Sequence, residues 1–345
     1  MLGQPLHPMP TPSVRRYDTV KAISRSSRLV AALAATTGLL LTGCSTGAGQ
    51  PNAAAIIGDK VISVAEVQRR IDGGLAAQDP TYLRLQAQNK LDLAGRGLLS
   101  VLIRLELLER LAQREGVQVD NSAVDSVIAS FGGSLPENAF PAYDEQVLRE
   151  RIRGDMLASE IGKKYANRTS VSFDLVVTDS REDAVAKAKQ MAKGPAAAAQ
   201  LVKDELAKKR QAGKNADFAF SRASSAIAAS PIFATGANTV VAFPLPDESG
   251  QMEQTTPTSQ WLVAYVHKRD TSTTTPPNPQ AGQAGASAQA KLNGALGRGM
   301  ASLLREEIGM QVNPRYGTWD LTNAQLVPSA LEQATLQLKA TTPRS

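Results

Sequence analysis

The stretch from residue 98 to residue 124, LLSVLIRLELLERLAQREGVQVDNSAV, decides the fold. Its first half is apolar at almost every position around a helix, which predicts a helix that other helices surround. Gly116 predicts the end of this helix, and Asp120 predicts the start of another after a short extended bridge. Aromatic residues make up only 4% of the chain, so we expect a mainly aliphatic core. The apolar positions are Leu98, Leu99, Val101, Leu102, Ile103, Leu105, Leu107, Leu108 and Leu111.

A strand pair and further helices are predicted around this central helix. Residues 53–62 read as two strands that turn at Gly58 and Asp59. Ser63 stands three positions before Glu66, the spacing of a capping box, which satisfies two free amides at a helix start. Apolar residues at helical spacing then predict helices over residues 64–73, 81–115, 121–131 and 142–165.

The pattern changes at Val171, where shorter strands and helices begin to alternate. This alternation is typical of an α+β domain. The predicted strands cover residues 172–177, 239–243 and 261–266, and the predicted helices cover residues 181–192 and 196–211. The sequence then predicts a linker at 271–288, a helix at 289–310, an edge strand at 312–320 and a polar tail at 321–345. The fold class is therefore mainly α with an α+β insert.

The N-terminal region has the layout of a signal peptide. Basic residues precede an apolar run from Leu29 to Leu41, and that run spans about 20 Å as a helix, too short to cross a membrane. The run leads through Thr42 and Gly43 to Cys44, the one cysteine of the chain. The pattern resembles a bacterial lipobox, which implies that residues 1–43 are removed and that Cys44 is lipidated. The alternative is a secretory signal peptide with an incidental cysteine.

Removal of residues 1–43 lowers the net charge of the chain. The full chain is formally +6, but this segment holds five basic residues and one acidic residue, so the mature chain is +2. A nucleic-acid partner is therefore not expected. The basic run from Lys208 to Lys214 is interpreted as the solvated end of a helix, although contact with anionic lipid or cell-wall polymer is an alternative. With Cys44 lipidated, no disulfide is available to the mature chain.

Four segments resemble SurA-type and PrsA-type extracytoplasmic chaperones. They are AAIIGDKVISVAEVQRRI at 54–71, residues 98–131, VLRERIRGDMLASEIGKKY at 147–165 and VNPRYGTWD at 312–320. The resemblance implies that residues 53–168 and 289–320 form one helical chaperone module, which a tether at 44–52 joins to the lipid. It also implies that short strands near Ile56 and Tyr316 pair, and that residues 171–270 are an inserted parvulin-like domain.

Parvulins are prolyl isomerases that generally carry one histidine in the first strand and one in the last, facing each other across the prolyl site. The matching positions here are Asp174 and Leu262, while His267 lies beyond the expected position. The resemblance therefore implies a degenerate domain without catalytic residues. An unrelated α+β insert is the alternative. No cofactor or metal is expected, because His267 has no histidine or cysteine partners from which a zinc site could be built.

The expected function is that of a chaperone anchored by lipid to the extracytoplasmic face of the cell membrane. Its expected partners are unfolded or nascent exported proteins, bound by burial of their apolar side chains. Two alternatives remain at this stage. One is an active peptidyl-prolyl isomerase of the cell envelope, and the other is a non-enzymatic envelope scaffold or binding lipoprotein.

Overall fold

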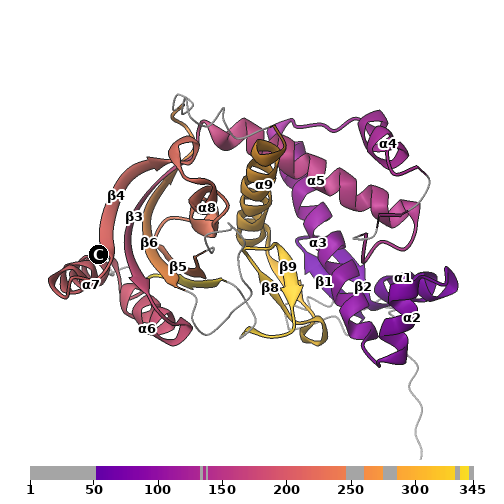
Figure 1. The fold of residues 1–345 in the computed structure, drawn as a ribbon, viewed down its shortest axis with the longest axis horizontal. Helices are drawn as coiled ribbons and strands as arrows, with labels where there is room; N and C mark the ends of the chain where they lie inside the picture. The colour runs from indigo at the N-terminus through magenta and orange to yellow at the C-terminus, as the bar shows by residue number, and fades with distance from the viewer. Residues whose placement is uncertain are drawn as a thin grey trace, which may run out of the picture. The chain divides into compact units, whose positions relative to one another are not determined.

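The apolar stretch around Leu98 forms α3 (Leu91–Glu115), and the computed structural model buries it as expected. The structure describes residues 52–132, 135–136, 139–245, 260–274, 286–330 and 335–341. The predicted signal peptide, Cys44 and nearly all of the tether lie outside these residues. Residues 49–345 belong to one compact unit, and the fold is mixed, with a helical part and several antiparallel sheets (Figure 1).

The local signals for helix ends are confirmed. The Ser63 hydroxyl accepts a hydrogen bond from the Glu66 amide at 3.0 Å at the start of α1 (Val64–Ala76). Gly116 ends α3 with a positive φ of 65°, and Asp120 caps α4 (Asn121–Ala129). One boundary was missed, because the predicted helix 81–115 is two helices, α2 (Pro80–Ala87) and α3. The break falls at Asn89, whose φ is 55°.

Two long helices, α5 (Glu145–Ala166) and α9 (Ala286–Ile308), pack against α3 and against each other. Glycines bring α5 and α9 unusually close. A Cβ atom at Gly162 would lie 1.8 Å from the Asn293 carbonyl oxygen, and one at Gly297 would lie 1.9 Å from the Ala158 carbonyl oxygen. These two glycines therefore allow the backbones of the two helices to touch.

A small antiparallel sheet joins the beginning of the described chain to its C-terminal part. Its order is β2-β1-β7, formed by β1 (Ala53–Ile57), β2 (Lys60–Ser63) and β7 (Met310–Val312). Ile56 lies opposite Gln311, and the Asn313 side-chain amide donates to the Ala53 carbonyl at 3.1 Å. The predicted pairing of the strand near Ile56 with the C-terminal segment is therefore present. Tyr316 itself lies in a short 3-10 helix, η4 (Pro314–Tyr316).

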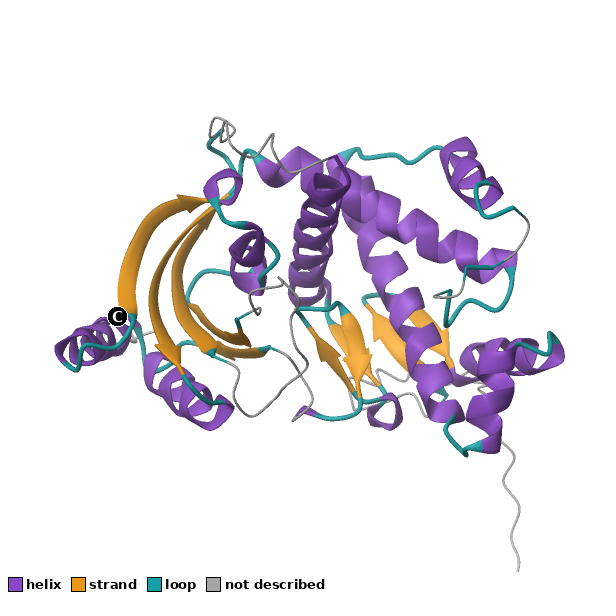
Figure 2. Cartoon of the chain, in the orientation of Figure 1, coloured by secondary structure: helices purple, strands orange, loops and turns teal. Residues whose placement is uncertain are grey.

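The second half of the chain forms a five-stranded antiparallel sheet of order β10-β5-β6-β3-β4, whose strands lie side by side (Figure 2). One face of the sheet packs against two helices and the other joins the core around α3. Between β4 and β5 lie η1 (Phe220–Arg222), α8 (Ser225–Ala228) and η2 (Pro231–Ala234). The other elements are β3 (Ser170–Thr178), α6 (Arg181–Met191), α7 (Pro195–Ala207), β4 (Ala212–Ala219), β5 (Thr239–Pro244), β6 (Trp261–Asp270) and β10 (Leu336–Lys339).

The predicted polar tail at 321–345 is wrong for the residues that the structure describes. β8 (Thr318–Asp320) pairs with β9 (Gln325–Val327), and β10 pairs with β5, with Gln337 opposite Val241. The reason is that alternate leucines of β10, Leu336 and Leu338, pack against the helix-covered face of the large sheet. The sheet is therefore completed by a segment far outside residues 171–270.

Candidate functional site

The two positions that match the parvulin histidines do not face each other. Asp174 on β3 points to the sheet face covered by α6 and α7, where Tyr265 and Val176 also lie. Leu262 on β6 belongs to the opposite face and to the core around α3. Neighbouring side chains along a strand point to opposite faces, so these two positions lie on the two sides of the sheet.

The structure brings Asp174 next to His267 instead. The His267 Nε2 atom lies 3.2 Å from the buried carboxylate of Asp174, and the His267 ring lies 4.8 Å from the Tyr265 ring. The Tyr265 hydroxyl donates to the Asn238 side chain at 3.2 Å, and burial raises the pKa of Tyr265. In the pairing of β3 with β6, His267 is the extra residue of a bulge, because Phe173 lies opposite Val266 and Ser172 lies opposite Lys268. The sequence alone did not reveal this register.

The other face of the sheet is filled by phenylalanine side chains and by the helical part of the molecule. Rings of Phe218 and Phe220 lie 6.2 Å and 5.2 Å from the ring of Phe233 in η2. Arg269 donates to the Phe233 carbonyl at 2.9 Å, and η2 contacts α9. Among the described residues, this face is therefore a packed core and not an open site.

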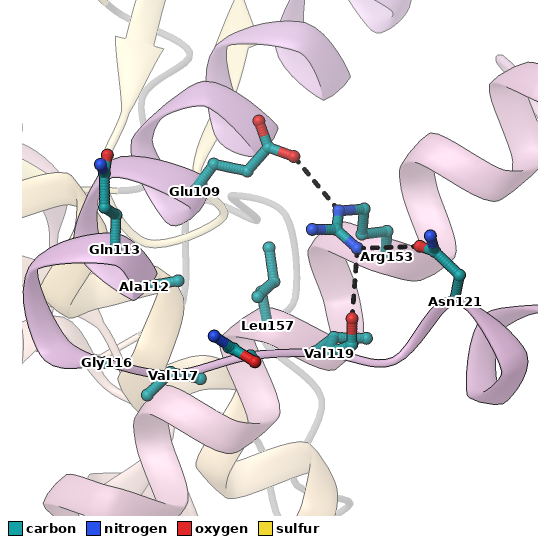
Figure 3. A pocket seen from close by; sticks show the side chains of 10 residues that line it. Glu109, Ala112, Gln113, Gly116, Val117, Val119, Asn121, Arg153 and Leu157 are labelled. Atoms are coloured by element: carbon teal, nitrogen blue, oxygen red, sulfur yellow. Dashed lines mark hydrogen bonds and ion pairs between the residues drawn. The ribbon is translucent and has the colours of Figure 1, made fainter.

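An open groove lies in the helical part, between the end of α3, the bridge to α4, and α5. Its volume is about 630 Å³. Figure 3 shows the side chains that line it. Its apolar floor combines the buried side chains of Ala112 and Leu157 with the half-buried side chains of Val117 and Val119. Its polar lining consists of Glu109, Gln113, Gln118, Asn121 and Arg153.

Arg153 holds the open side of this groove together. Its side chain reaches from α5 to three partners, as Figure 3 shows: the Glu109 carboxylate at 3.2 Å, the Asn121 side-chain oxygen at 3.3 Å and the Val119 carbonyl at 3.4 Å. One cation thus links α3, the bridge and the start of α4. The pairs are partly exposed, so their contribution is to position these elements more than to stabilise them.

The sequence predicts that clients are bound by burial of their apolar side chains but does not indicate where. The short extended bridge predicted between Gly116 and Asp120 is present, and its two valines, Val117 and Val119, form part of the floor. Glu109 and Arg153 stand on different helices, 44 positions apart, and no local pattern relates them. The groove therefore becomes visible only when α3 and α5 are packed together.

Exposed apolar side chains follow the groove along the chain. Phe131, Leu135 and Phe140, in the connection between α4 and α5, are each more than a third exposed, at 36%, 36% and 37%. The Phe140 ring lies 5.9 Å from the buried Tyr82 ring, so it is anchored on one side and open to solvent on the other.

Comparison with known proteins identifies no family. No protein-family model and no curated protein matches this sequence. The chain is similar to the crystal structure of foldase protein PrsA from Streptococcus pneumoniae at 15% sequence identity, over 68% of this chain and 83% of that chain, with a TM-score of 0.19. A similarity this low does not identify a common fold.

Neither a membrane-spanning helix nor a metal site is present among the described residues. None of the helices in this part of the chain is long and apolar enough to cross a membrane. The same residues contain no group of three or more histidine, cysteine, aspartate or glutamate side chains that is arranged to hold a metal ion.

Proposed function

We propose that this protein is a chaperone that binds unfolded exported proteins outside the cytoplasm, held at the membrane by lipid on Cys44 and without prolyl isomerase activity. The observation that carries the proposal is the groove between α3 and α5, with its apolar floor and polar lining. A groove of this kind takes an extended chain, because apolar side chains enter the floor while the backbone keeps polar contacts at the rim.

Binding in such a groove is passive and reversible. Burial of apolar surface contributes roughly 25 cal/mol per Å², and much of this is offset by the cost of ordering a flexible partner. The groove has one charged wall, Glu109 with Arg153, and these two charges already neutralise each other. A binding site of this character favours apolar segments without selecting one sequence.

The groove can be tested by filling it. Gln118 is exposed and lines the groove, so Gln118→Trp should place a large ring over the floor without disturbing the core. Val117→Glu should place a charge on the floor itself. Both variants should lose the ability to delay aggregation of a chemically unfolded client, measured by light scattering. Val61→Glu is the matched control, because Val61 is 39% exposed on β2 and away from the groove.

Thermal unfolding of each variant separates a blocked groove from a damaged fold. We expect Gln118→Trp to unfold at the temperature of the unmodified protein. If that variant remains folded and still delays client aggregation as well as the unmodified protein does, the groove is not the binding site.

The lipid anchor is tested on Cys44. Cys44→Ala should give an uncleaved or soluble species, because the acyl chains supply the membrane affinity at about 0.8 kcal/mol per buried CH₂. A mass spectrum of the mature protein should begin at acylated Cys44. A mature N-terminus at another residue would contradict this part of the proposal.

The lack of isomerase activity rests on the placement of Asp174, Leu262 and His267. Asp174 and Leu262 lie on opposite faces, and His267 is already engaged by Asp174 at 3.2 Å. We expect no acceleration of a proline-limited refolding reaction, which is slow without a catalyst. Acceleration that His267→Ala abolishes would establish an active isomerase. No effect on refolding or on client aggregation would favour an envelope scaffold.

A further inference from the structure

A second groove lies beside an edge of the large sheet. β4 is the last strand in the order β10-β5-β6-β3-β4, so one of its sides has no neighbouring strand in the described chain. The groove has a volume of about 580 Å³ and lies between α7 and β4. A helix beside a free strand edge can hold an added strand, because the edge supplies backbone hydrogen bonds and the helix supplies side-chain contacts.

The register of β4 shows which backbone groups are free. The Val177 amide donates to the Gln211 carbonyl at 2.9 Å, and Asp174 lies opposite Lys214 in the same register. Hydrogen-bonded and non-hydrogen-bonded positions alternate along an antiparallel pair, so Gly213 and Asn215 bond to β3. The backbone N–H and C=O groups of Ala212 and Lys214 therefore point outward, away from β3.

The free edge is short. The pairing of β3 with β4 shifts register between Phe173, which faces Asn215, and Val171, which faces Phe218. Within this bulge Asp217 has a φ of 50°. Bulges of this kind end the pairing surface of an edge strand. The straight part of the edge thus runs from residue 212 to residue 215, long enough for about four residues of an added strand.

One stripe of α7 faces this edge. Its members are spaced three or four positions apart, which places them on one side of the helix. Leu206, at the end of this stripe, is a large apolar side chain that is 53% exposed. The stripe consists of Ala196, Ala199, Gln200, Lys203 and Leu206.

The charge of the groove is positive. Lys203 and Lys214 both line it, and neither has a carboxylate partner among the described residues. The nearby buried carboxylate of Glu205 is already bound by three cations, Lys187 at 3.0 Å, Lys208 at 3.2 Å and Arg210 at 3.4 Å. The groove is therefore complementary to an acidic segment that also carries small apolar side chains.

We propose that the edge of β4 binds an extended polypeptide segment by strand addition, with acidic and small apolar side chains directed into the groove against α7. The inference rests on the proposed function in one respect, since it makes the bound segment part of an unfolded client. The β4 edge is a second site, distinct from the groove between α3 and α5, and it selects segments with acidic and small apolar side chains.

The test uses a seven-residue probe, acetyl-Thr-Val-Thr-Glu-Thr-Val-Thr-amide, and its counterpart with lysine in place of glutamate. Binding to the mature protein is followed by fluorescence anisotropy of labelled probe. The glutamate probe should bind about tenfold more tightly than the lysine probe at low salt, and the difference should shrink as salt is added. Hydrogen exchange should slow at residues 212 and 214 when the glutamate probe is bound.

Variants separate backbone pairing from charge. Lys214→Pro removes an outward N–H, which an edge strand tolerates, and should bind the glutamate probe about tenfold more weakly than Lys214→Gln does. Ala199→Trp should fill the groove and abolish binding. Ala186→Trp is the matched control, because Ala186 is exposed on the neighbouring helix α6 and does not line the groove.

Three results would overturn the inference. One is equal affinity of the Lys214→Pro and Lys214→Gln variants for the probe. The second is no binding of either probe by a protein that still delays client aggregation, which would leave the proposed function standing. The third is binding to vesicles of phosphatidylglycerol and phosphatidylcholine, lost in the Lys203→Gln, Lys214→Gln double variant, without peptide binding. That result would assign the surface to anionic lipid.

Probe binding by a protein that does not delay client aggregation would support the β4 site and refute the proposed function.

Discussion

The contact between α5 and α9 gives the sharpest test of how the two ends of the helical part are joined. A Cβ atom added at Gly162 would lie 1.8 Å from the Asn293 carbonyl oxygen, whereas real Cβ atoms essentially never approach another heavy atom closer than 3.0 Å. Gly162→Ala must therefore push α9 away by about 1.2 Å, because the obstacle is backbone and cannot rotate aside.

The magnitude follows from two opposing terms. Forced overpacking of a close-packed interface costs about 3 kcal/mol at the upper end of its usual range. The better helix propensity of alanine offsets about 1 kcal/mol of this. We expect the free energy of unfolding, measured by urea denaturation, to fall by about 2 kcal/mol in Gly162→Ala. The melting temperature should fall by roughly 5 °C.

Gly154→Ala is the matched control on the same helix. A Cβ atom there would lie 3.8 Å from the Leu105 Cδ1 atom, an ordinary contact distance. This variant should keep the propensity gain and be more stable than the unmodified protein by about 0.5 kcal/mol or more. Equal stability of the two variants would refute the close approach of α5 and α9.

Three further predictions follow from buried and edge residues. Burial alone would raise the pKa of Glu205, but hydrogen bonds from Lys187 and Lys208 hold that pKa below its ordinary value. The ionised Glu205 carboxylate therefore stabilises the folded state at neutral pH, and this contribution is lost as the pH falls below about 4.5. Glu205→Gln should lower the free energy of unfolding by about 2 kcal/mol at pH 7. It should also weaken the dependence of that free energy on pH in the acid range, and an unchanged dependence would contradict the prediction. Truncation after residue 330 removes β10 and exposes the edge of β5, so it should lower the free energy of unfolding by about 3 kcal/mol. An unaltered midpoint of urea denaturation would show that β10 does not stabilise the sheet. Leu108→Ala, in a fully buried position, should cost about 3 kcal/mol in the same assay, and Leu206→Ala, 53% exposed, should cost less than about 0.5 kcal/mol.

Signals confined to a few residues were predicted well from the sequence. Ser63, Gly116 and Asp120 each act on backbone groups within one helical turn, so their effect does not depend on the rest of the fold. The central helix was predicted for the same reason, since its apolar residues cover all of its sides. The break at Asn89 was missed because asparagine tolerates a positive φ without requiring it.

Strands that depend on distant partners were predicted poorly. The basic run from Lys208 to Lys214 is predicted to be the solvated end of a helix, but its last three residues belong to β4, because β3 supplies their hydrogen bonds. The sequence predicts β10 to be part of a polar tail, because its few residues gain their structure only by pairing with β5. The misplacement of Asp174 and Leu262 has a similar origin. The β3–β6 pairing places Asp174 opposite Tyr265, and Leu262 stands three positions before Tyr265 on the same strand, so it points to the other face.

The bond between Asn313 and Ala53 spans 260 positions of sequence, and it has a consequence for how the molecule is made. As the chain emerges from its N-terminus, α3 and α5 form early, but α9 arrives only after the whole five-stranded sheet except β10 has been produced. Long-range pairings of this kind form slowly. For about half of its synthesis the nascent protein therefore exposes the apolar faces of α3 and α5 that α9 later covers. During that interval the incomplete chain is itself prone to aggregate.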